Sequence, residues 1–199
     1  MNSHIRLFNR ISRFYGWFFK TQKKHYLNHV IPKLPFELRG LSVIDIGAGT
    51  GALSSAMKEV NANVVMLDGS PKMLSIAEKK QADQKIPYVV RDVLKDDLTD
   101  LGRFDMAISA YLAHGLNQDD RQILYQKMRQ LSSRYIVFYE HRKSRNIFIK
   151  FIEWLERGDY FNYVKVAEEE ITEYFKNLTV INVTKRSVLY IIDCDFDSE

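Results

Sequence analysis

One acid and three glycines stand close together in the stretch VIDIGAGTGALSSAM. Asp45 lies within the apolar run, and Gly47, Gly49 and Gly51 follow it before the sequence becomes helix-like. A glycine turn between a strand and a helix lets the backbone approach a ligand closely and presents free N–H groups at the positive end of the helix. The dinucleotide-binding pattern requires a glycine where Ala52 stands, and the Asp45 carboxylate would repel a pyrophosphate. The turn therefore suits a ligand with a cationic group, such as an amino-acid ammonium.

Two further acids stand where expected strands end. Asp68 closes the apolar run 63–68, and Asp92 follows the run 87–91. Ligands of open α/β sheets bind at the carboxyl ends of the strands. We therefore expect Asp45, Asp68 and Asp92 to meet at one ligand-binding edge. The segment RDVLKDDLTD also contains other acids, which a solvated loop would explain.

A second group of reactive side chains follows the fourth and fifth expected strands. His114 is a candidate general base or a partner for a substrate hydroxyl, and a structural role is the alternative. Tyr111 stands near it, and Glu140, His141 and Arg142 reach the same edge after the fifth strand. Further along the chain, three aromatic residues could line a pocket: Tyr160, Phe161 and Tyr163.

These residues need a parallel sheet to bring them together, and the hydropathy pattern predicts one. Short Val/Ile/Leu runs alternate with amphipathic stretches, which is typical of a doubly wound α/β fold. Two β-rich runs joined only by a Lys-Arg pair must form an antiparallel hairpin. We expect a Rossmann-like, mostly parallel sheet of about seven strands with a C-terminal hairpin and an N-terminal helical arm. The expected strands are 42–46, 63–68, 87–91, 106–110, 134–140, 178–184 and 187–193, and the expected helices are 52–60, 71–81 and 119–131.

The motifs VIDIGAGTG, VVMLDGSPKML, VVRDV and FDMAISAYLAHGL resemble, in this order and spacing, the class I S-adenosylmethionine-dependent methyltransferases. The resemblance implies S-adenosyl-L-methionine as the cofactor and S-adenosyl-L-homocysteine as its product. It implies that the glycine turn holds the methionine moiety, that Asp45 supports the ammonium group, and that Asp68 accepts both ribose hydroxyls. Asp92 and the Val93 backbone would meet the adenine amino group. The full set of implied cofactor contacts is Asp45, Gly47, Ala48, Gly49, Gly51, Asp68, Gly69, Met73 on the adenine face, Asp92, Val93 and Ser109.

The N-terminal stretch HIRLFNRISRFYGWFF is basic and aromatic. Its apolar residues share one face of a helix and its arginines another, which is typical of a lid or of a helix bound to a membrane surface. LFNRISRFYGWFF also resembles the lead-in of the ubiquinone and menaquinone biosynthesis methyltransferases, with Asn9 and Gly16 in place of two aspartates. That likeness implies that Tyr15 lies near the active site. We expect a lid, with peripheral membrane contact through residues 1–20 as the alternative.

Composition and charge narrow the classes of function. The 199 residues suit an arm, residues 1–40, and one cofactor-binding domain, residues 41–199. The arm carries a net charge of +7 and the domain −3. The mildly acidic domain argues against a nucleic-acid substrate, and SAYL stands where adenine methyltransferases have their base-stacking Asn/Asp-Pro-Pro-Tyr/Phe motif. A lone cysteine, Cys194, and apolar runs shorter than about 20 residues predict a cytoplasmic protein.

We therefore expect a methyltransferase that acts on a small-molecule or lipophilic acceptor by in-line methyl transfer. Such a reaction mainly requires that the protein align the nucleophile and exclude water. The candidate catalytic residues are His114, Tyr15 and Tyr111, and no metal is expected. The alternatives are a non-catalytic S-adenosylmethionine-binding regulatory protein and a nicotinamide-dependent dehydrogenase.

Overall fold

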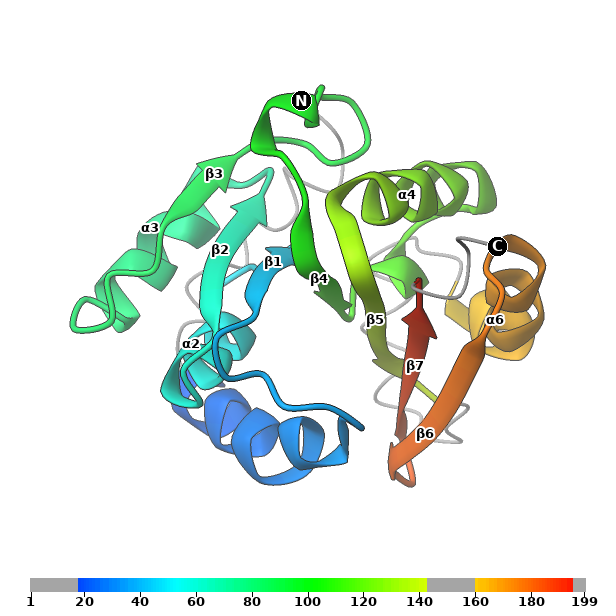
Figure 1. Cartoon of the computed structure of the whole chain (residues 1–199), viewed down its shortest axis with the longest axis horizontal. Coiled ribbons are helices and arrows are strands. Elements are labelled where there is room, and N and C mark those ends of the chain that lie inside the picture. The colour runs from blue at the N-terminus through cyan, green and yellow to red at the C-terminus, as the bar shows by residue number, and fades with distance from the viewer. Residues whose placement is uncertain (1–17, 143–159, 195–199) are drawn as a thin grey trace.

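The computed structural model describes residues 18–142 and 160–194, which form a seven-stranded sheet between two layers of helices (Figure 1). The strand order is β3-β2-β1-β4-β5-β7-β6, with β1 to β5 parallel and β7 antiparallel to both of its neighbours. This order confirms the predicted doubly wound fold and its C-terminal hairpin. The strands are β1 Ser42–Ile46, β2 Asn63–Asp68, β3 Tyr88–Val90, β4 Phe104–Ala110, β5 Ser132–His141, β6 Leu178–Thr184 and β7 Ser187–Asp193.

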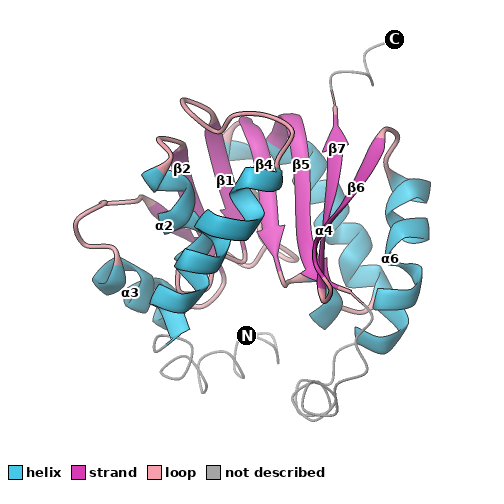
Figure 2. Cartoon of the chain, turned by 90° about the horizontal axis from the view of Figure 1, so that it is seen from below, coloured by secondary structure: helices cyan, strands magenta, loops and turns pink. Residues whose placement is uncertain are grey.

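Helices cover both faces of this sheet, as the views in Figures 1 and 2 show. On one face, α2, α3 and the N-terminal helical segment enclose an apolar cluster that includes Val43, Met57 and Met106. On the other face, α4 and α6 enclose a second cluster around Ile46 and Phe138. The principal helices are α2 Ala52–Glu59, α3 Pro71–Lys80, α4 Gln118–Leu131 and α6 Tyr160–Tyr174.

The N-terminal segment is helical over residues 18–25 and continues as a π-helix, Tyr26–Val30, and a 3-10 turn, Ile31–Lys33. Tyr26 and Val30 are buried in the apolar cluster beneath α2. This confirms the predicted N-terminal helix for the described part of the arm. The arginine-rich stretch and Tyr15 lie outside the described residues.

Capping side chains determine where two helices begin. The Ser70 hydroxyl accepts a hydrogen bond from Met73 N at 3.2 Å, and Pro71 occupies the first position of α3, as predicted. The helix α4 begins one residue earlier than expected, because the Asn117 side chain caps it by accepting from Asp120 N at 2.9 Å. Asp120 therefore lies in the first turn of α4, where its negative charge is stabilised by the positive end of the helix dipole.

The sequence prediction missed α6. The sequence suggests no helix here and offers Tyr160, Phe161 and Tyr163 as pocket residues. Instead α6 begins at Tyr160, and Tyr163 is fully buried against α4 in the second apolar cluster. The prediction that Tyr163 could line a pocket is therefore wrong.

Candidate active site

The glycine turn follows β1 at the point where the strand order reverses between β1 and β4, which is where such sheets bind ligands. Gly47, Gly49 and Gly51 have φ angles of 73°, 56° and 75°, which favour glycine. A Cβ at Gly51 would lie 2.8 Å from Gln81 Nε2 and 2.9 Å from Met66 Sδ, so this glycine is required for packing. At Gly49 the nearest atom to a Cβ would be Gly47 O at 3.9 Å. Gly49 therefore leaves room for close approach of a ligand.

Four amides of the turn are already engaged, which corrects the expectation of free N–H groups at these positions. Their acceptors lie at the end of β2 and within the turn itself. These bonds tie the end of β1 to the end of β2. Gly47 N and Ala48 N donate to Leu67 O at 2.8 and 3.1 Å, Gly49 N donates to Asp68 Oδ2 at 2.8 Å, and Gly51 N donates to Ala48 O at 2.9 Å.

Asp68 lies at the end of β2, with its carboxylate directed to the glycine turn. Its Oδ2 accepts from Gly49 N, and its Oδ1 accepts from Ser70 N at 2.7 Å, so the side chain spans the half-buried Gly69. Burial raises the pKa of Asp68, and the two backbone N–H groups oppose that rise. Each carboxylate oxygen can accept more than one hydrogen bond, so both can still receive a ligand hydroxyl.

Asp45 occupies β1 on the face covered by α2 and is 1% exposed. Its Oδ2 accepts from the Ser54 hydroxyl at 2.5 Å. Burial raises the pKa of Asp45 to about 7, the Ser54 hydrogen bond opposes this rise, and the charge of Asp68 adds to it. A cation bound beside Asp45 would favour its ionised form.

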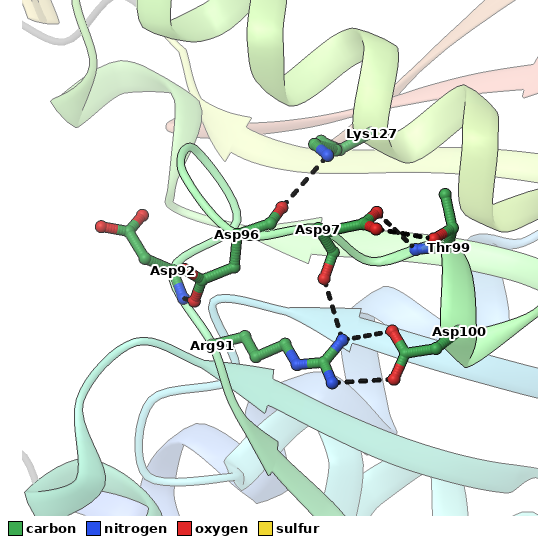
Figure 3. A network of polar contacts seen from close by, with 7 residues as sticks. All are labelled: Arg91, Asp92, Asp96, Asp97, Thr99, Asp100 and Lys127. Atoms are coloured by element: carbon green, nitrogen blue, oxygen red, sulfur yellow. Dashed lines mark hydrogen bonds and ion pairs between the residues drawn. The ribbon is translucent and has the colours of Figure 1, made fainter.

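The loop after β3 is braced by its own acids (Figure 3). Asp92 N donates to Asp96 Oδ2 at 2.7 Å, and Asp92 Oδ1 accepts from Leu94 N at 3.1 Å. Arg91 closes the other side of the loop by donating to both carboxylate oxygens of Asp100. The Asp92 carboxylate points away from the other labelled side chains, and the next residue, Val93, is buried. The loop thus holds Asp92 in a defined position beyond the sheet edge.

Two more of the predicted cofactor residues are buried near this edge. Met73 lies in the first turn of α3 and is 3% exposed. Ser109 is fully buried in β4, paired with Ile46 of β1, and its Oγ has no hydrogen-bond partner within the described part of the chain. A buried hydroxyl without a partner is costly and marks a place where a polar ligand group fits.

The predicted acceptor residues occupy a loop that follows β4. Tyr111 adopts a left-handed φ of 55°, and its N–H donates to Tyr139 O at 2.8 Å. The fully buried carboxylate of Glu140 accepts from Leu112 N at 3.0 Å and from Ala113 N at 2.8 Å. Its Oε2 lies 2.8 Å from His114 Nδ1. Sequence analysis placed these residues at one edge but did not foresee that Glu140 holds the loop.

Aromatic rings connect this loop to the N-terminal segment. His141 stacks on Tyr111 with ring centroids 4.2 Å apart, and Tyr111 packs against Tyr139 at 4.8 Å. His25 Nε2 lies 2.7 Å from the Tyr139 hydroxyl. Burial, reinforced by His114, lowers the pKa of His141 to about 4, so this ring is neutral at pH 7. The edge is therefore lined by neutral and aromatic surfaces as well as by the acids.

Other parts of the chain add little chemistry to this edge. Arg142, which the sequence also predicts at this edge, donates to Asn182 Oδ1 of β6 at 2.7 Å. Among residues 18–142 and 160–194, His, Cys, Asp and Glu do not cluster in threes as metal ligands would. Over the same ranges, every helix is too short or too polar to cross a membrane.

The chain resembles known methyltransferases over the part that contains the glycine turn and the three acids. Residues 43–133 match the family model described as a methyltransferase domain. The ubiquinone biosynthesis O-methyltransferase of Methylobacterium nodulans is 33% identical over 79 residues, which are 39% of this chain and 32% of that protein. The cypemycin N-terminal methyltransferase of a Streptomyces species is 35% identical over 85 residues, 43% of this chain and 34% of that protein. The chain thus spans about a third of the length of these relatives.

Solved structures share the whole fold at low sequence identity. The DhpI–SAH complex matches with a TM-score of 0.68 and 15% identity, over 95% of this chain and 94% of that one. Magnesium protoporphyrin IX methyltransferase from Synechocystis PCC 6803 with bound SAM matches with a TM-score of 0.56 and 14% identity, over 97% and 85% of the two chains. These likenesses confirm the predicted fold.

Proposed function

We propose that the protein transfers a methyl group from S-adenosyl-L-methionine to a small-molecule acceptor, because residues 43–133 match the family model described as a methyltransferase domain. The observation that carries the proposal is the pair of carboxylates, Asp45 and Asp68, beside the glycine turn. Acids in these positions suit a ligand that has an ammonium group and a ribose diol. They do not suit a pyrophosphate, and the comparisons do not favour a dehydrogenase or a non-catalytic protein.

The proposal assigns a cofactor contact to each of these residues. Asp45 supports the ammonium group, and Asp68 receives the ribose hydroxyls on the outer lone pairs of its two oxygens. Ser109 offers its buried hydroxyl to a polar group of the cofactor. The remaining contacts form the surrounding wall: the turn residues Gly47, Ala48, Gly49 and Gly51 near the methionine moiety, Gly69 near the ribose, and Met73, Asp92 and Val93 near the adenine.

When bound, the cofactor supplies an electrophilic methyl group on a sulfonium. The protein's own part is to hold the acceptor in line with that group and to exclude water. Tyr111 and His114 lie on the side of the glycine turn that faces the end of β4, and we assign the acceptor to that side. Tyr15, which precedes the described residues, joins them if residues 1–40 form a lid on domain 41–199. The bond between His25 and Tyr139 supports this position of the arm.

The acceptor is a small molecule, and a lipophilic one fits the partly exposed rings of Tyr111 and His25, both of which pack against the buried Tyr139. The relatives support the view that residues outside the matched segment select the acceptor. They are similar to this chain over nearly the same segment, yet one is a ubiquinone biosynthesis O-methyltransferase and another a cypemycin N-terminal methyltransferase. Contact of residues 1–20 with a membrane surface would help such an acceptor enter. Salt-sensitive flotation with anionic liposomes that is lost when residues 1–20 are deleted would support this contact, and flotation unchanged by the deletion would contradict it.

Titration calorimetry tests the cofactor assignment directly. S-adenosylhomocysteine should bind and NAD should not. Asp68→Ala should weaken binding by about 1–3 kcal/mol, because charge-assisted hydrogen bonds to the ribose are lost. Asp83→Ala serves as the matched control, since Asp83 is an exposed acid beyond the end of α3. Binding of NAD without binding of S-adenosylhomocysteine would refute the proposal.

A further inference from the structure

Glu140 is a carboxylate that is fully buried at the end of β5, and every hydrogen bond described for it comes from one loop. Oε1 accepts from Leu112 N and Ala113 N, and Oε2 faces His114 Nδ1 at 2.8 Å. Burying an ionised carboxylate is costly unless it is paired and hydrogen-bonded. The two amides already satisfy the hydrogen bonding of Oε1, and the contact of Oε2 with His114 is a separate one.

The loop that contains Leu112 and His114 packs against the glycine turn. A Cβ on Gly47 would lie 3.0 Å from Leu112 Cδ2, so the loop packs directly on the glycine turn. His114 stands two residues after Leu112, and its side chain is 11% exposed. The loop that carries the imidazole is therefore beside the proposed cofactor site, and the imidazole itself is mostly shielded from water.

We propose that Glu140 is a positioning residue that holds His114 as the proton acceptor for methylation of a hydroxyl group, which makes the acceptor a hydroxyl-bearing small molecule. The inference rests on the proposed methyltransferase function. When Nδ1–H donates to a carboxylate, the tautomer is fixed and Nε2 becomes the basic nitrogen. Glu140 also stabilises the imidazolium once the proton has arrived.

The step balances without any further reactant. The acceptor oxygen forms a bond to the methyl carbon while the carbon–sulfur bond breaks and its electron pair stays on sulfur. The hydroxyl proton passes to His114 Nε2, and the resulting imidazolium is paired with Glu140 until the proton leaves to solvent. A neutral amine acceptor attacks with a lone pair and needs no base for that step, so a fixed base favours a hydroxyl.

The groups around His114 are compatible with this role. His141 lies 5.1 Å away between ring centroids and is neutral at pH 7, and Tyr111 stands at 6.3 Å. From the helical side, α4 and α6 contribute the closed ion pair of Arg121 and Glu170, and Arg121 also donates to Leu116 O at the end of the loop. Another net charge among these groups would compete with Glu140 for the imidazolium, and none of them supplies one.

The buried phenol of Tyr163 in α6 also faces Glu140. Burial raises the pKa of Tyr163 and the charge of Glu140 adds to this rise, so the phenol stays neutral over the working pH range. Within the described part of the chain, His114 is the ionisable side chain that is hydrogen-bonded to Glu140.

The alternative role for Glu140 is purely structural, as a clamp for the two loop amides. Glu140→Gln separates the two roles, because the amide oxygen of glutamine can still accept from Leu112 N and Ala113 N but carries no charge. Glu173→Gln is the matched control, since Glu173 is exposed on α6. Both variants are first compared with the unaltered protein by thermal unfolding and by calorimetry with S-adenosylhomocysteine. If the unaltered protein does not bind S-adenosylhomocysteine, the proposed function is refuted. If it binds, two further measurements decide the role of Glu140.

The first measurement is an NMR titration of the His114 imidazole in the full chain. We expect the tautomer protonated at Nδ1 in the unaltered protein and a titration midpoint about one pH unit lower in Glu140→Gln, because an adjacent carboxylate favours the imidazolium. The midpoint should not move in Glu173→Gln. A midpoint unchanged by Glu140→Gln would overturn the positioning role, even if the variant were less stable.

The second measurement uses methyl-labelled S-adenosylmethionine with an equimolar mixture of catechol and o-phenylenediamine, which have the same shape but differ in the attacking atom. Label should enter catechol, and Glu140→Gln should slow this transfer at least about tenfold and shift its pH profile while cofactor affinity stays unchanged. Preferential label in the diamine, absence of label in catechol, or an unchanged pH profile would overturn the hydroxyl acceptor.

Discussion

Cofactor affinity should rise with pH, because Asp45 has to ionise before it can support an ammonium group. Asp45 is 1% exposed, and burial raises its pKa to about 7. In the free protein at pH 6 the carboxyl is therefore mostly protonated and neutral. A bound ammonium group favours the ionised form, so binding must release a proton from Asp45.

The size of the effect follows from the fraction of Asp45 that is ionised before binding. With a pKa of about 7, roughly 3% is ionised at pH 5.5 and roughly three quarters at pH 7.5. Affinity should thus increase roughly twentyfold to thirtyfold over this interval, which is about 2 kcal/mol. Above pH 7.5 the contribution of Asp45 levels off.

Calorimetry with S-adenosylhomocysteine in buffers of different ionisation enthalpy measures both the affinity and the protons released. At pH 6 we expect about 0.9 proton released per site from Asp45. Asp45→Asn should abolish this release, and Ser54→Ala should move the pH dependence to higher pH, because the Ser54 hydrogen bond lowers the pKa of Asp45. Asp83→Asn, at an exposed acid, is the control. Equal proton release by the unaltered protein and Asp45→Asn would refute this reasoning.

Three further predictions concern stability in urea unfolding. Gly51→Ala should lower the free energy of unfolding by about 2–5 kcal/mol, because the added Cβ has both an unfavourable φ and contacts below 3.0 Å. Gly40→Ala, at a φ of 80° with open space around it, should lower it by only about 1–2 kcal/mol. Equal losses in the two variants would contradict the packing role of Gly51. Glu170→Ala should lower the free energy of unfolding by about 3–5 kcal/mol, because it removes the carboxylate bonded to Arg121, whose side chain is 1% exposed. An unchanged free energy of unfolding would show that water can replace the Glu170 carboxylate. His141 takes up its proton near pH 6.5 in the unfolded chain but only near pH 4 in the folded protein, so the free energy of unfolding should fall as the pH drops between these values. His141→Asn should make this dependence on pH less steep. An unchanged pH dependence would contradict the lowered pKa of His141.

The predicted strands were close to those of the structure because each is a short apolar run bounded by a turn signal. β1 and β2 have the predicted bounds, and so do the hairpin strands β6 and β7, where the Lys-Arg connection left a single arrangement. The helix α6 was missed although Tyr163, Ala167 and Ile171 repeat at a spacing of four and are all buried. That spacing is the signal that could have revealed it.

The sequence indicated which acids meet at the site but not how they are bonded. Asp45 and Asp68 could be placed because each lies in or at the end of an apolar run. The engagement of the turn amides depends on Leu67 O, whose position follows from the register of β1 against β2. In the same way, Glu140 reaches His114 only through the pairing of β4 with β5, which no local pattern encodes.

The place of β7 in the sheet has a consequence for biosynthesis. β7 lies between β5 and β6, although it follows both in the sequence. Until Ser187–Asp193 leave the ribosome, the far side of β5 has no strand to pair with, and an unpaired edge of this kind is prone to aggregation. The bond from His25 to Tyr139 likewise joins residues 114 positions apart. The sheet therefore cannot be completed until Ser187–Asp193 have been made, and the far edge of β5 stays unpaired until then.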